Sequence, residues 1–180
     1  ISLILAKMVG KNGQVFAFEA LPANLDRMQK NLSLNQLDSD RVEIVPRAVT
    51  DRPGTVQFLV HSSGEMGKIE GSAGRQTAYA SSISITGVSV DAFVFDENNP
   101  PPQVVKMDIE GGEVLALPGM QRVLETYHPL MLLELHGPEA NQVAWDVLSR
   151  YGYQFYLMQP GYPPVYQREG LGWKAYCVAK

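Results

Sequence analysis

Acidic side chains and a histidine stand where three apolar segments of the chain end. Glu19 closes QVFAFE, Asp108 and Glu110 follow VVKM, and Glu134 and His136 close LMLLELH. Two neighbouring carboxylates can raise the pKa of one of them and so produce a general base, and histidine titrates near neutral pH. Asp108, His136 and Glu110 are therefore candidates for catalytic proton transfer, with Glu134 as a supporting group.

Each of these residues also has a structural interpretation. Asp108 can orient backbone groups while Glu110 or Glu113 caps the next helix, and a lone histidine such as His136 is more often structural than catalytic. Glu19 can accept hydrogen bonds from both hydroxyls of a ribose, or it can cap the helix that follows. Position alone leaves both interpretations of Glu19 open, and a ribose-binding acid indicates a nucleoside ligand rather than a reaction.

Other kinds of site find less support in the sequence. The chain has no HxxH, HExxH or CxxC spacing and no GxSxG segment, so it predicts neither a metal site nor a serine nucleophile. Whether a metal assists stays open, because the acids at the segment ends and His136 can converge in space. The only cysteine, Cys177, lies in an apolar run and is predicted to be a buried structural thiol. A disulfide within the chain is thereby excluded, which favours a reducing, cytoplasmic compartment.

The composition is that of one globular domain. The chain has 180 residues, 45% of them hydrophobic, and a net charge of -4, so we expect a single domain over residues 1–180. Its basic residues are scattered, which argues against a nucleic-acid partner. No run of 18 apolar residues occurs, so no membrane-spanning helix is predicted.

The elements that must position these side chains follow from periodicity and turn signals. Strands and helices alternate along most of the chain, which predicts a mostly parallel α/β sheet, and two consecutive strands at the end predict an antiparallel edge. Ligands bind such sheets at the carboxyl ends of the strands, where the acids stand. Helices are expected at 1–9, 22–34, 113–127 with a break at 118–119, and 139–151, and strands at 14–19, 41–49, 55–60, 104–109, 130–136, 153–158 and 173–179.

Four segments of the chain together resemble the FkbM family of methyltransferases. They are VFAFEALPANLDRMQKNLSLNQL, VEIVPRAVTDRPGTVQF, VVKMDIEGGEVLALPGM and LMLLELH, in that order and at family-like spacing. The strand that ends in an acid before Pro and Asn, the AV-T-D-x-x-G turn and the K-x-D-I-E-G-x-E block carry the similarity. It covers roughly residues 1 to 137.

The resemblance implies a Rossmann-like class I methyltransferase sheet with S-adenosylmethionine as methyl donor. It also implies O-methylation of a hydroxyl on a small molecule or sugar. Carried over by position, Glu19 and Ala20 hold the ribose, the stretch of Pro46, Arg47 and Ala48 lines the adenine, and Asp108 lies beside the methionine end and the reacting centre. Pro46 and Arg47 replace residues that are commonly small or polar in the family.

One part of the family pattern has no counterpart in this sequence. The first strand and the D-x-G-A-N-x-G loop belong before Ile1, and residues 1–8 resemble the helix that follows that loop. We therefore expect an incomplete sheet and no cofactor binding by these 180 residues alone. Two other classes stay open: a nicotinamide-dependent dehydrogenase, which predicts a parallel last strand, and a non-catalytic module derived from a methyltransferase.

The methyl acceptor is not named by the sequence. The Gly- and Ser-rich segment 61–82 reads as a long loop or flap, and together with segment 159–169 it is expected to shape the acceptor pocket. Tyr79, Tyr162 and Tyr166 in these segments can stack on a sugar ring or act as packing lids. His61 and His128 have weaker support as functional residues.

Overall fold

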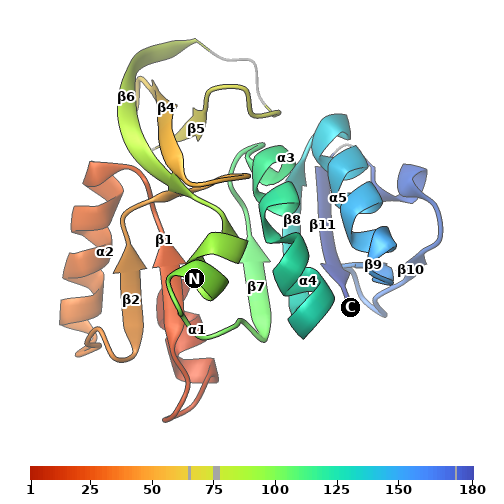
Figure 1. Ribbon diagram of the computed structural model, residues 1–180, viewed down its shortest axis with the longest axis horizontal. Helices are drawn as coiled ribbons and strands as arrows, with labels where there is room; N and C mark the ends of the chain where they lie inside the picture. The colour runs from red at the N-terminus through yellow and green to blue at the C-terminus, as the bar shows by residue number, and fades with distance from the viewer. Residues whose placement is uncertain (65, 75–77, 173) are drawn as a thin grey trace.

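The computed structural model describes residues 1–64, 66–74, 78–172 and 174–180, and its strands form three groups. Two short parallel strands lie beside α2, five strands form the C-terminal sheet, and a four-stranded lobe stands at the end toward which β2 and β7 point (Figure 1). None of the helices in the described parts of the chain is long and apolar enough to cross a membrane.

The five-stranded sheet holds the main core. Its order is β10-β9-β11-β8-β7, with β7 parallel to β8 and with β11 antiparallel to both β8 and β9. Met131, Leu133 and Leu135 of β8 are almost fully buried, since helices cover the sheet. The elements are β7 (Val104–Met107), α3 (Glu113–Ala116), η2 (Leu117–Met120), α4 (Gln121–Tyr127), β8 (Leu130–His136), α5 (Pro138–Arg150), β9 (Phe155–Leu157), β10 (Pro164–Val165), η3 (Arg168–Leu171) and β11 (Lys174–Ala179).

The two-stranded part is much smaller. β1 (Val15–Phe18) pairs in parallel with β2 (Val42–Val45), between α1 (Ser2–Met8) and α2 (Pro22–Leu34). Its core cluster consists of Ala6, Ala17, Leu32 and Val42, with partly buried neighbours. Among the described residues, β1 pairs with β2 alone and β7 with β8 alone, so each of these two strands has one edge without a partner strand.

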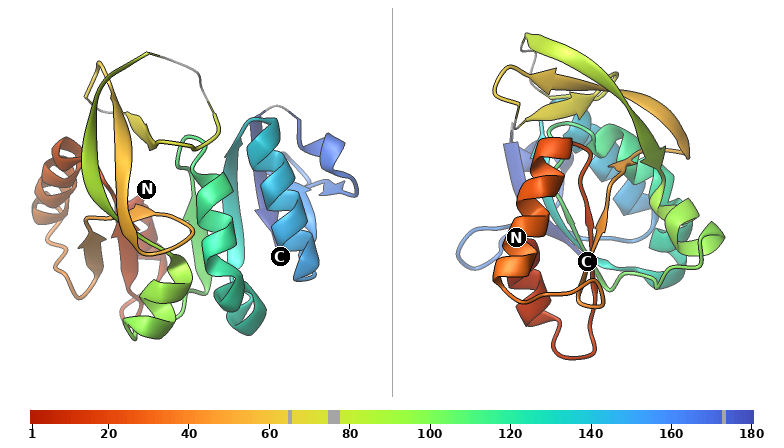
Figure 2. Two further views of the ribbon diagram at one scale, coloured as in Figure 1. Left: turned by 45° about the horizontal axis from the view of Figure 1, so that its top comes forward. Right: turned by 90° about the vertical axis from the view of Figure 1, so that its left-hand side faces the viewer.

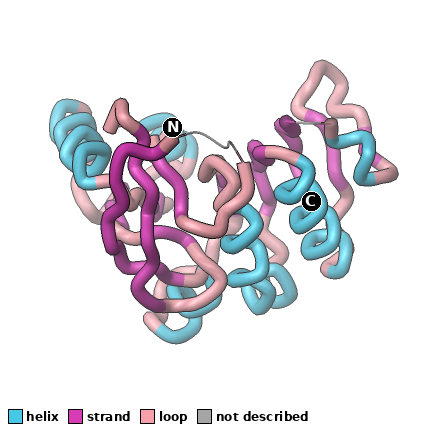
Figure 3. Tube along the Cα trace, turned by 90° about the horizontal axis from the view of Figure 1, so that it is seen from above, coloured by secondary structure: helices cyan, strands magenta, loops and turns pink. Residues whose placement is uncertain are grey.

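The lobe consists of β3 (Ala48–Val49), β4 (Gly54–His61), β5 (Gly67–Ile69) and β6 (Tyr79–Val88), followed by the short helical turn η1 (Ala92–Asp96). β4 is antiparallel to β5 and β6, and β3 is parallel to β6. In both views of Figure 2 the lobe projects from one end of the molecule. Seen from above, it lies on the side of β1 and away from α5 and the C-terminus (Figure 3).

Most predicted elements are present, and the break at 118–119 is confirmed because η2 separates α3 from α4. The prediction that 61–82 is a loop was wrong, since β5 and the first part of β6 lie there. The alternation Ser-Ile-Ser-Ile-Thr over residues 82–86 is the strand signal that composition obscured. The predicted strand 41–49 is divided at Pro46, which lacks a backbone N–H, and its halves join different sheets.

The expected direction of the strands was right in part. The closing pair is antiparallel, as predicted, through β9 and β11. A mostly parallel arrangement was wrong: among the described pairings three are parallel and five are antiparallel. The lobe accounts for two of the five antiparallel pairings, and only its strand β4 and the short β3 fell within predicted strands.

Candidate functional site

A pocket of about 300 Å³ lies where β1 and β7 end and where the lobe approaches them. Its walls combine the acids predicted from the sequence with apolar groups of the lobe. Five residues predicted to bind the cofactor line it, and so does Glu110, whereas Pro46, predicted to line the adenine, is not among the described lining residues. The relevant lining residues are Glu19, Ala20, Arg47, Ala48, Asp108 and Glu110, with Phe58, Met66 and Ile69 from the lobe or next to it.

Glu19 makes local hydrogen bonds beside the start of α2 and also lies on the pocket wall. Its Oε1 accepts hydrogen bonds from the backbone N–H groups of Ala20 (2.7 Å) and Leu21 (2.8 Å), and its Oε2 accepts one from the Asn24 side chain (3.1 Å). The carboxylate therefore stabilises the turn that leads into α2, where Pro22 occupies the first helical turn. It does so while lining the pocket.

Arg47 lines the pocket, but its guanidinium already has a partner. It donates two hydrogen bonds to the Glu97 carboxylate, at 2.5 and 2.8 Å, and lies over the Phe93 ring. The hydrogen bonds from Arg47 lower the pKa of the Glu97 carboxyl below its ordinary value. A bidentate pair of this kind fixes the arginine side chain, so its contribution to the pocket is a positioned wall.

His136, at the end of β8, is held by Glu113, for which the sequence suggested only a role as a helix cap. His136 Nδ1 lies 3.2 Å from Glu113 Oε1, to which the backbone N–H of Ile109 also donates, at 3.1 Å. Glu113 is fully buried and His136 is 6% exposed. A carboxylate only accepts, so Nδ1 carries the proton and Nε2 faces away. The hydrogen bond with Glu113 is the main cause that raises the pKa of His136.

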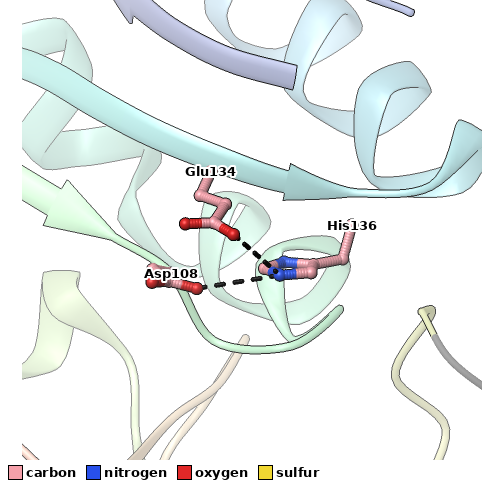
Figure 4. A group of neighbouring side chains, drawn as sticks. All are labelled: Asp108, Glu134 and His136. Carbon is pink, nitrogen blue, oxygen red and sulfur yellow. Dashed lines mark ion pairs between the residues drawn. The ribbon is translucent and has the colours of Figure 1, made fainter. Parts of the chain in front are cut away.

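Three carboxylates face the other nitrogen of His136. Nε2 lies 3.5 Å from Glu134 Oε1, 3.7 Å from Asp108 Oδ1 and 3.8 Å from Glu110 Oε2. Figure 4 shows Asp108 and Glu134 directed at the imidazole. Burial is the main cause that raises the pKa of Asp108, although Lys106, 3.5 Å away, opposes the shift.

The structure thus brings the three predicted catalytic residues together, but only two of them lie on the described wall of the pocket. Asp108 and Glu110 line the pocket, whereas the lining among the described residues does not include His136. The signal for Glu113 was in the sequence, as the last acid of the KMDIEGGE block. Glu110 adopts a left-handed backbone (φ 52°), and Asp108 and Glu110 lie together on a turn after β7.

The remaining candidates lie elsewhere. His128 is exposed and ends α4 in a left-handed conformation, and the side chain of His61 contacts Ser63. The described lining of the pocket contains no residue of segment 159–169, and neither Tyr162 nor Tyr166 reaches it. Cys177 is buried as predicted, and burial raises the pKa of its thiol to about 12.

The structure defines an α/β domain with a pocket at the ends of its strands, the place where open α/β sheets bind ligands. Within that class the family is shown by the sequence: residues 2–155 match the family model of the Methyltransferase FkbM domain, and the chain belongs to this family. It is 32% identical over 130 residues to hexuronic acid methyltransferase AglP of Haloferax volcanii. The match covers 68% of this chain and 47% of AglP.

A solved structure supports the fold. The crystal structure of Methyltransferase FkbM from Methylobacillus flagellatus KT superposes with a TM-score of 0.59 at 18% identity, over 98% of this chain and 38% of that one. The chain therefore spans about half the length of AglP and less than half of the other protein. The match to the solved structure, at this identity, concerns the mixed α/β fold.

Proposed function

We propose that this chain is the greater part of an S-adenosylmethionine-dependent methyltransferase domain, in a protein that methylates a hydroxyl on a small molecule or carbohydrate. The observation that carries the proposal is a single pocket that joins Glu19, at the end of β1, to Asp108 and Glu110 after β7, in a member of the FkbM family. The similarity to AglP, a hexuronic acid methyltransferase, favours a carbohydrate acceptor.

The groups that line the pocket suit S-adenosylmethionine. Oε2 of Glu19 receives one described hydrogen bond, from Asn24, and a carboxylate oxygen has two lone pairs, so it can still accept from a ribose hydroxyl. Ala20 and Ala48 add small apolar wall, and Arg47 adds a wall that its pair with Glu97 holds in place. The volume of about 300 Å³ is at the lower end for small-ligand sites.

Positioning is the main task left to the protein. S-adenosylmethionine supplies an electrophilic methyl group when bound. Asp108 and Glu110 would orient the acceptor hydroxyl from the pocket wall, and the hydroxyl proton would pass to the cluster that these acids form with His136. Glu113 and Glu134 would hold that cluster in place. Fixed orientation of two reactants accounts for a large share of rate enhancement in such displacements.

We also propose that the complete sheet is Rossmann-like, with one further strand that joins the unpaired edges of β1 and β7. Such a strand would complete the backbone hydrogen bonds of both neighbours. The dehydrogenase alternative predicted a parallel last strand, and β11 is antiparallel to both of its neighbours, which favours the methyltransferase.

Calorimetry on the protein in its natural length tests the proposal. We expect saturable binding of S-adenosylmethionine and S-adenosylhomocysteine, no binding of NAD, and at least a tenfold loss of S-adenosylmethionine affinity in Glu19→Gln. Transfer of a radiolabelled methyl group to hexuronic acids and neutral sugars then identifies the acceptor. Binding of NAD would favour the dehydrogenase, and a protein that binds neither compound would be a non-catalytic module.

A further inference from the structure

We propose that Asp108, Glu134 and His136 bind one divalent cation that accepts an imidazole nitrogen together with carboxylate oxygens, such as Mn²⁺ or Zn²⁺. The three residues lie on two neighbouring parallel strands or directly after them, and one ligand atom from each lies within 4.8 Å of the others (Figure 4). No metal-binding spacing in the sequence indicates the site, because 25 residues, which include α3, η2 and α4, separate Asp108 from Glu134.

The first argument is the state of the His136 imidazole. Its side chain is 5% exposed, and Nε2 is buried without a hydrogen-bond partner. A buried polar atom without a partner costs free energy and therefore calls for a functional explanation. This nitrogen is aimed at two carboxylates, so a cation between them would satisfy it.

The second argument is the spacing of the ligand atoms. Nε2 lies 3.5 Å from Glu134 Oε1 and 3.7 Å from Asp108 Oδ1, which is too far for direct hydrogen bonds. Atoms that each lie about 2.1 Å from one ion are about 3.0 Å apart at right angles and about 3.4 Å apart in a tetrahedron. The observed separations exceed the tetrahedral value by a few tenths of an ångström, which small side-chain rotations remove.

The third argument is the support behind the ligands. Metal-binding histidines usually donate their second N–H to a carboxylate, which fixes the ring and its tautomer. Glu113 provides that acceptor at Nδ1, from a fully buried position on α3. The hydroxyl of Tyr176 donates to Glu134 Oε1 at 2.9 Å and thereby orients the second ligand.

Charge gives the fourth argument. Four carboxylates, those of Asp108, Glu110, Glu113 and Glu134, surround one imidazole, and Lys106 is the lysine that pairs with one of them. Even with His136 protonated, the group carries an excess of negative charge in a half-buried place. A divalent cation would offset this charge, and its mixed nitrogen and oxygen ligands favour Mn²⁺ or Zn²⁺ over Mg²⁺.

The site would bear on the reaction through the acceptor, and this part rests on the proposed methyltransferase function. A cation bound beside Asp108, on the pocket wall, would coordinate the acceptor hydroxyl and favour loss of its proton, while Glu110 remains at the wall to receive it. It would also let an acceptor that carries a carboxylate approach a pocket wall that is otherwise acidic.

Metal binding is measured without the methyl donor, so it is independent of the methyltransferase proposal. The natural-length protein, stripped with EDTA, is titrated with Mn²⁺ and Zn²⁺ and followed by calorimetry and, for Mn²⁺, electron paramagnetic resonance. We expect one ion per chain, with a nitrogen coupling from the imidazole that disappears in His136→Ala. Asp108→Asn and Glu113→Gln should each weaken binding about tenfold or more.

Glu125→Gln, an exposed acid on α4 outside the cluster, is the matched control and should bind as the parent does. Circular dichroism checks that His136→Ala is folded, and Asp108→Asn serves if it is not, since Asp108 is partly exposed. The metal site is refuted if no saturable binding occurs up to about 1 mM ion, or if Asp108→Asn binds as tightly as the parent. Methyl transfer at full rate in EDTA would refute a role of the ion in the reaction and would support the methyltransferase function. Bound metal without any methyl transfer would support the metal site and would contradict the methyltransferase function.

Discussion

The pocket is built from two regions that differ in how firmly they are packed. Glu19 belongs to the two-stranded part, where the buried cluster consists of two alanines, one leucine and one valine. The acid cluster around His136 belongs to the five-stranded sheet, whose core includes the fully buried Leu117, Met120 and Phe155. A two-stranded sheet is marginal alone, whereas several strands covered by helices are stable. Ligand binding across the pocket would therefore join a firm part to a weak one.

The two regions also treat their carboxylates differently. The described hydrogen bonds of Glu19 all come from groups at the start of α2, so its charge is well stabilised without a ligand. At His136 the carboxylates face an imidazole and one another, and two buried atoms, Glu113 Oε2 and His136 Nε2, have no hydrogen-bond partner among the described residues. The weakly packed region thus holds an acid with three described hydrogen bonds, and the firmly packed region holds a cluster in which these two buried atoms lack a hydrogen bond among the described residues.

Leucine truncation tests the difference in packing and should give the largest effect. Leu133→Ala, in β8, should lower the free energy of unfolding by about 4 kcal/mol, and Leu32→Ala, in α2, by about 2 kcal/mol, because the smaller cluster loses fewer contacts and closes more easily. Urea denaturation measures both. Leu34→Ala, at a side chain that is 81% exposed, is the control and should change stability by less than about 0.5 kcal/mol. Equal losses for Leu133 and Leu32 would remove the distinction between the regions.

Substitution of Glu19 tests whether its carboxylate is satisfied by the helix. Glu19→Ala should cost about 1 kcal/mol of stability, since the N–H groups of Ala20 and Leu21 lose their acceptor. Glu19→Gln keeps one carbonyl oxygen for those donors, so it should cost less, although its ligand affinity falls. Thermal and urea denaturation of both variants check this. If alanine and glutamine are equally destabilising, the stabilisation comes from the charge of Glu19 and not from its geometry as an acceptor.

The sequence was sufficient for much of this arrangement. Long apolar segments and turn signals predicted β1, α2, β8 and α5 nearly to their ends, and the acids at the strand ends pointed to the pocket. It was insufficient where contacts are distant in sequence. In the lobe, β4 was predicted, but β5 and β6 were missed because Gly and Ser obscured the alternation in residues 79–88. The direction of β6 depends on a partner strand whose paired residues lie 18 to 33 positions away.

The site shows the same limit. Glu19, Ala20, Arg47, Ala48, Asp108 and Glu110 were predicted from position and resemblance, and all line one pocket. The pairing of Glu113 with His136 joins residues 23 positions apart, and it depends on how α3 packs over β8. The pairing of Arg47 with Glu97 spans 50 positions and likewise has no local signal.

The smallest expected effect concerns the outer face of α1, in the weakly packed region. Ile4 is 63% exposed and Met8 is 74% exposed, one turn apart, whereas Leu3 packs against the small core. Ile4→Gln should therefore change the free energy of unfolding by less than about 0.5 kcal/mol, because glutamine suits a helix and little apolar surface is lost. Leu3→Gln, at the neighbouring position that packs against the small core, should cost more than about 1 kcal/mol. If Ile4→Gln lowers the free energy of unfolding by more than about 1 kcal/mol, this face of α1 is covered in solution. The β1–β2 part would then be more firmly packed in solution than the exposure of Ile4 and Met8 indicates.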